Sequence, residues 1–139
     1  MDKLVSDSAA LRGHARPAER VSLTKLLGER IVVLDGATGT LIQRKKLDES
    51  VYRGDRFKDH GRDLKGNSDI LNLTQPDIVL DLHRAYLAAG ADVVQTNTFN
   101  ATTVSQSDYA TQSWVAEINR AGASLARRAA DEAMRADPL

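Results

Sequence analysis

The spacing of apolar and polar positions predicts strands and helices that alternate along the chain. Residues 22–28 show a short helical pattern that ends at a glycine. Residues 31–34 are a continuous apolar run between charged neighbours, which is typical of a strand buried on both faces. A second strand is expected to start at Val93 and to lead into the polar segment 95–99.

Two longer segments show helical periodicity. The first is predicted to begin at Thr74, because Thr74 and Asp77 form a capping box and Pro76 is tolerated in a first turn. Gly90 is expected to end this helix. The last helix is predicted over roughly residues 112–134. The apolar stripe of the first helix consists of Ile78, Val79, Leu82, Ala85, Tyr86 and Ala89.

The order of these elements implies parallel strands joined by right-handed crossovers. Two parallel strands do not make a stable sheet alone, and a complete eightfold barrel needs roughly 250 residues. The predicted fold class is therefore α/β, a partial TIM-type (β/α) barrel with the first two strand–helix units only. We expect residues 1–21 to be a flexible N-terminal arm and residues 22–139 to be the N-terminal portion of a truncated barrel domain.

The segment 44–67 is highly charged and longer than an ordinary connection. Segments of this kind are usually functional lids or disordered. Tyr52, Arg53 and Phe57 are candidates to fold it over the ends of the strands. Trp114, at the start of the last helix, is interpreted as a packing residue.

Composition narrows the possible partners. The chain of 139 residues is 42% hydrophobic and 27% charged, with a formal net charge of zero. This balance gives no reason to expect a nucleic-acid or membrane partner. No apolar run approaches the roughly 20 residues of a transmembrane helix, and the N-terminus lacks a signal-peptide pattern, so we expect a cytoplasmic location.

The chain contains no cysteine, and its three histidines are not at metal-ligand spacing. Disulfides and thiolate metal sites within the chain are therefore excluded, and no metal ligand is predicted. We interpret His60 as solvated and His83 as a surface or boundary residue of its helix. His14 falls in the expected arm.

The strongest candidate site is the segment Asp35-Gly36-Ala37-Thr38-Gly39-Thr40 at the end of the first predicted strand. Gly36 and Gly39 allow a close approach of the backbone to a ligand, and consecutive free amides form an anion-binding nest. Asp35 beside such a nest suits a zwitterion, because the amides take a carboxylate and Asp35 takes an ammonium. The alternative is a tight turn in which Asp35 is a local cap.

The second candidate site is the polar segment 95–100, which ends the second predicted strand. Its amides and hydroxyls, those of Asn97 and Thr98 among them, are expected on the same rim as Asp35, because active sites of parallel α/β folds lie at the carboxyl ends of strands. Turn chemistry at a strand end is the alternative. The first site does not have the spacing of a Walker or dinucleotide-binding loop.

Several segments in the same order resemble the homocysteine S-methyltransferase family. The resemblance covers roughly residues 22–135. The chain departs from the cobalamin-dependent branch at two positions: Thr38 replaces its common Met, and Gln95 replaces its common Glu. The matching segments are Arg30–Thr40, Tyr52–Phe57, Asp63–Asn67, Ala89–Asn100, Ala116–Asn119 and Leu125–Arg127.

This resemblance implies an eight-stranded barrel whose loops hold homocysteine and a zinc ion bound by three cysteines. The zinc keeps the sulfur as a thiolate, which takes a methyl group from methylcobalamin, itself charged from methyltetrahydrofolate. Asp35 matches the family position that contacts the amino-acid end of homocysteine. Together with the two candidate sites, this predicts Asp35, Gly36, Ala37, Asn97 and Thr98 as the substrate-binding residues. The implied partners are homocysteine and the cobalamin and folate modules of a parent chain.

Because the family's cysteines lie later than the part that this chain matches, we expect no catalytic residue here. We also expect the chain alone to bind neither zinc nor cobalamin and to be inactive. Three alternatives stay open: a branch that uses betaine or S-methylmethionine as donor, a non-catalytic amino-acid-binding or interaction module, and an unrelated α/β barrel with a phosphate-type anion site.

Overall fold

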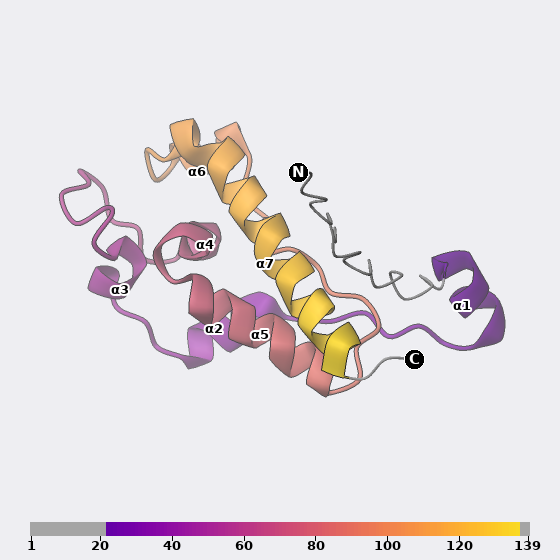
Figure 1. Cartoon of the computed structure of the whole chain (residues 1–139). Coiled ribbons are helices and arrows are strands. Elements are labelled where there is room, and N and C mark those ends of the chain that lie inside the picture. The colour runs from indigo at the N-terminus through magenta and orange to yellow at the C-terminus, as the bar shows by residue number, and fades with distance from the viewer. Residues whose placement is uncertain (1–21, 137–139) are drawn as a thin grey trace, which may run out of the picture.

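The computed structural model describes residues 22–136 as a set of helices joined by loops (Figure 1). The expected arm 1–21 lies outside the described residues. The helices are α1 (Leu23–Glu29), α2 (Thr38–Arg44), α3 (Glu49–Arg53), η1 (Ser68–Ile70), α4 (Leu71–Thr74), α5 (Pro76–Ala88), α6 (Thr103–Ser107), η2 (Gln112–Trp114) and α7 (Val115–Ala136).

The core forms where α5 and the long helix α7 pack side by side, with α4 against both (Figure 1). The apolar stripe of α7 faces this core, as its periodicity predicts. The stripe predicted for α5 is only partly right, because α5 buries Val79, Leu80, Leu82 and His83, whereas Ala85 and Ala89 are exposed. By contrast, α1 buries none of its residues and lies apart from the packed helices. The core cluster consists of Ile42, Tyr52, Phe57, Leu64, Ile70, Leu71, Val79, Leu82, Ala101 and Ile118.

The predicted fold class was wrong for the described chain, because residues 22–136 contain no strand or sheet. The two expected strands meet only at one isolated parallel bridge, between Leu34 and Val93. Asp35 donates its N–H to the carbonyl of Val93 at 2.9 Å, and Asp92 donates to Val33 at 2.8 Å. A partial (β/α) barrel is therefore replaced by a helical architecture.

The physical reason is that a parallel sheet needs cover on both faces and neighbours at its edges. Ile31 is 87% exposed and Leu34 is 54% exposed, so most of the apolar run lacks cover within the described chain. Its pairing is supported instead by an ion pair, in which the Arg30 guanidinium contacts both oxygens of Asp92 at 2.6 and 2.7 Å. Arg30 holds the pKa of Asp92 at about 2.

The helix boundaries differ from the predicted ones at two places. Thr74 does not cap α5: it ends α4, its hydroxyl donates to the carbonyl of Ile70 at 3.4 Å, and Gln75 is the N-cap of α5. Gly28 lies inside α1 and not after it. Gly90, with φ of 97°, follows α5 as predicted.

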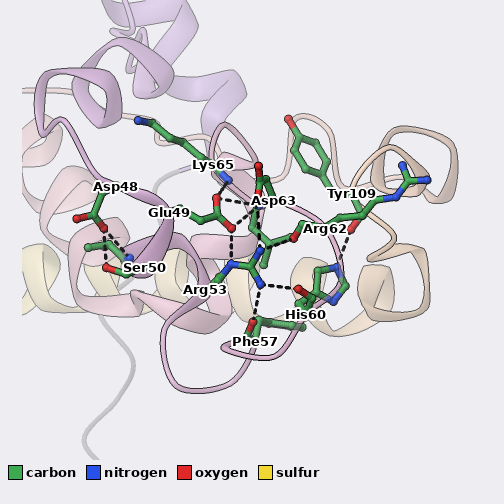
Figure 2. A network of polar contacts seen from close by, with 12 residues as sticks. Asp48, Glu49, Ser50, Arg53, Phe57, His60, Arg62, Asp63, Lys65 and Tyr109 are labelled. Atoms are coloured by element: carbon green, nitrogen blue, oxygen red, sulfur yellow. Dashed lines mark hydrogen bonds and ion pairs between the residues drawn. The ribbon is translucent and has the colours of Figure 1, made fainter.

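The charged segment 44–67 is ordered by its own polar contacts, not by apolar periodicity (Figure 2). Arg53 pairs with Glu49 and donates to the carbonyls of His60 and Arg62 at 2.5 and 2.9 Å. Glu49 in turn accepts the backbone N–H groups of Leu64 and Lys65. These contacts close the loop onto α3.

The aromatic side chains of this segment pack inward. Tyr52 and Phe57 are buried, and the Phe57 ring meets the Trp114 ring edge-on at 5.6 Å. The packing role predicted for Trp114 is confirmed, whereas Tyr52 and Phe57 are core residues, not parts of an open lid. Across residues 22–136, no helix is long and apolar enough to cross a membrane.

Candidate functional site

A cavity of about 660 Å³ lies between the two loops that follow the Leu34–Val93 bridge. One wall is the glycine-rich segment 36–39 and the other is the segment 95–100, with Ser68 and Asp69 between them. Because Leu34 and Val93 are paired in parallel, the two loops that follow them begin side by side. The predicted site residues Gly36, Ala37, Asn97 and Thr98 all line this cavity.

The backbone of the first loop offers donors to a ligand. Within the described chain, the N–H groups of Gly36 and Ala37 donate to no acceptor. Both residues are exposed at the cavity, whose other wall carries side-chain amides and hydroxyls. Free amides of this kind bind an anionic group such as a carboxylate.

Asp35 lies just behind the cavity wall and does not line it. It is 5% exposed, and both of its oxygens accept hydrogen bonds from Gln95. The Gln95 N–H donates to Oδ2 at 3.0 Å and its Nε2 donates to Oδ1 at 3.3 Å. Gln95 lines the cavity, so it separates Asp35 from the space that a ligand would fill.

Asn97 is tied into the wall and is only 7% exposed. Its Nδ2 donates to the carbonyl of Ser68 at 2.8 Å, and its own carbonyl accepts Nδ2 of Asn72 at 2.7 Å. The Thr98 hydroxyl lies 2.6 Å from the Thr96 hydroxyl. These bonds lock the segment 95–100 onto η1 and α4, so the wall is formed before any ligand arrives.

Two cavity residues, Ser68 and Asp69, were missed by the sequence analysis. Asp69 is 2% exposed and its Oδ1 accepts the N–H of Asn100 at 3.1 Å. Burial raises its pKa, against the effect of this bond. The available signal was an acid directly before an apolar helix start. Phe99, which belongs to the predicted segment 95–100, is 95% exposed at the rim.

His83 was also misread. It is 1% exposed within α5, not a surface residue, and its Nε2 is buried without a hydrogen-bond partner in the described structure. Burial lowers its pKa, and the nearby Asp35 charge acts in the opposite direction. His60 is half-buried, and its Nε2 lies 2.8 Å from the Tyr109 carbonyl, to which it donates.

The described residues do not fit a zinc centre. A catalytic zinc takes three protein ligands from thiolates, imidazoles or carboxylates. Residues 22–136 contain no group of three such side chains placed to hold a metal ion, and the whole sequence has no cysteine. No step of thiol activation is therefore assigned to this chain.

The model of the homocysteine S-methyltransferase family matches residues 32–138, which is more than half of the chain. The matched range contains both loops of the cavity and the helices that support them. The chain belongs to the homocysteine S-methyltransferase family.

Proposed function

We propose that the cavity binds the amino-acid end of homocysteine. The observation that supports this most is that the unpaired amides of Gly36 and Ala37 line the cavity, while the Asp35 carboxylate lies directly behind the wall that Gln95 forms. In this amino-acid clamp (Asp35, Gly36, Ala37, Asn97 and Thr98), the amides take the ligand carboxylate and Asp35 takes its ammonium. As the ligand enters, the hydrogen bond from Gln95 Nε2 to Asp35 Oδ1 breaks. It is the longer of the two hydrogen bonds between these residues.

We further propose that the clamp serves methyl transfer to the homocysteine sulfur, and that the parent enzyme is a cobalamin-dependent methionine synthase. Family membership supports the methyl transfer. The segments Tyr52–Phe57 and Asp63–Asn67 support the cobalamin-dependent branch, whereas Gln95 leaves the betaine and S-methylmethionine donors as alternatives. Zinc, cobalamin and folate would act through other parts of the parent enzyme.

A second candidate function is amino-acid binding without catalysis. The absence of a metal-holding group within residues 22–136 favours it for the chain alone. Membership of the homocysteine S-methyltransferase family argues against the third alternative, an unrelated phosphate-binding barrel.

Calorimetric titration of the chain with L-homocysteine and with inorganic phosphate tests the clamp. Saturable binding of homocysteine without binding of phosphate is expected. Binding of phosphate with no preference for an amino acid would overturn the proposal.

Activity and zinc binding test whether the chain alone is a catalyst. The chain is purified without a histidine tag, dialysed against a chelator, and assayed for zinc and for methionine with methylcobalamin, betaine or S-methylmethionine. We expect zinc binding no better than that of an ordinary acidic surface, since carboxylates alone make a weak zinc site, and we expect no turnover. Stoichiometric submicromolar zinc or methionine above background would show that this chain builds its own catalytic centre.

A further inference from the structure

Asp69 is a buried carboxylate that faces the cavity without a cationic partner. It lines the cavity directly, and within residues 22–136 no lysine, arginine or histidine forms an ion pair with it. Its hydrogen bonds come from backbone N–H groups, those of Asn100 and of Asp69 itself. A buried charge without a counter-ion is costly, and a ligand cation would offset that cost.

The two carboxylates at the site differ in how a ligand reaches them. Asp35 lies behind Gln95, which holds both of its oxygens, so a ligand cation reaches it only when the Gln95 side chain moves. Asp69 needs no such movement, because it already forms part of the cavity surface. Its position is fixed by Asn100 and by the bond from Asn97 to the neighbouring Ser68.

We propose that Asp69 is a second ammonium-binding carboxylate of the clamp and contacts the amino group of the ligand directly. This inference rests on the proposed function, since it assigns a further residue to the same site. An ammonium group has three N–H donors, so it can bond to Asp69 and to Asp35 together. The ligand carboxylate then binds the amides of Gly36 and Ala37.

Comparing homocysteine with 4-sulfanylbutanoate, which lacks only the amino group, isolates the ammonium contact. The ratio of the affinity for homocysteine to that for 4-sulfanylbutanoate is measured by calorimetry for the wild-type chain and for Asp69→Asn. Asparagine keeps the shape and can still accept the Asn100 N–H, but it carries no charge. Because charge-assisted hydrogen bonds are the strong ones, the ratio should fall by about tenfold or more.

Two further variants make the result specific. Asp63→Asn removes a carboxylate whose side chain is 90% exposed and should leave the ratio unchanged. The double variant Asp35→Asn with Asp69→Asn should bring the ratio close to one. Where Asp69→Asn does not fold, Asp69→Glu keeps the charge but moves it by one methylene, and a direct contact predicts a ratio changed several-fold.

The outcomes separate this inference from the proposed function. If the wild-type chain prefers homocysteine and Asp69→Asn keeps that preference, Asp69 has a structural role only and the inference is wrong. If Asp69→Asn lowers the affinity for both compounds by the same factor, the conclusion is the same. If the wild-type chain binds neither compound, the proposed function fails, and this inference with it.

Discussion

The carboxylate of Asp35 and the amide of Gln95 form a two-point contact at the back of the cavity. Oδ2 accepts the backbone N–H at 3.0 Å and Oδ1 accepts the side-chain Nε2 at 3.3 Å. The contact spans 60 positions in the sequence and joins the two loops that follow the bridge. It orients Asp35 toward the wall that Gln95 forms, so the negative charge is held at a fixed place behind the cavity wall.

Replacing Asp35 by Asn should therefore weaken homocysteine binding without changing the shape of the site. The loss of one charge-assisted hydrogen bond is worth roughly 1.5–3 kcal/mol, which corresponds to about a ten- to a hundredfold weaker affinity by calorimetry. Thr38→Met in the same loop should change the affinity much less, because the backbone of that loop is expected to contact the ligand. Unchanged binding by Asp35→Asn would remove Asp35 from the clamp.

Gly122 of α7 connects the core to the cavity wall. A Cβ atom at this position would lie 2.7 Å from Cγ2 of Thr98 and 2.8 Å from Nδ2 of Asn72. Overpacking of this kind costs about 1–3 kcal/mol, whereas alanine in a helix returns at most about 1 kcal/mol. Gly122→Ala should therefore lower the free energy of unfolding and also weaken homocysteine binding.

Gly28→Ala in α1 is the matched control, since nothing lies within 4 Å of its added Cβ. Urea titration followed by circular dichroism measures both variants. A Gly122→Ala protein as stable as the wild type would show that Thr98 and Asn72 shift without cost.

The sequence was sufficient to predict that the two cavity loops lie close together, because each is a polar segment that follows an apolar run. It was not sufficient to show whether those runs form a sheet. Pairing depends on neighbours that cover Ile31 and Leu34, and the apolar pattern itself carries no information on such neighbours. The order of segment 44–67 was also missed, because Arg53 organises it through backbone carbonyls, which have no periodic signature.

Arg56 should contribute to stability more through its ring contacts than through its ion pair. Its guanidinium contacts both oxygens of Glu117 at 2.7 Å and lies 4.6 Å from the Trp114 ring centre. A cation–π contact at an exposed site is worth about 0.5–1 kcal/mol and is less sensitive to salt than a surface ion pair. Arg56→Ala should therefore destabilise the chain more than Glu117→Gln.

Denaturation at low and at high salt separates the two contributions. The effect of Glu117→Gln should shrink at 1 M salt, where the Debye length is about 3 Å, whereas most of the Arg56→Ala effect should persist. Equal effects of the two substitutions at both salt concentrations would show that the ion pair, and not the stacking on Trp114, is the stabilising contact.

His83 should make the stability of the chain depend on pH below neutrality. Its imidazole is 1% exposed, its Nε2 has no partner in the described structure, and burial lowers its pKa below the ordinary value of 6.5. The unfolded chain then binds a proton on this histidine at a higher pH than the folded chain does. As pH falls below about 6.5, proton uptake favours the unfolded state, so stability is lost on acidification and is fully present above that value.

One such proton gives a slope of at most about 1.4 kcal/mol per pH unit. His83→Leu replaces the titrating group by an apolar side chain, so the free energy of unfolding should fall less steeply from pH 7.5 to 5.5. At pH 7.5 the variant should be about as stable as the wild type, because the lost nitrogen had no partner. If His83→Leu keeps the wild-type slope, the buried imidazole is not the group that titrates.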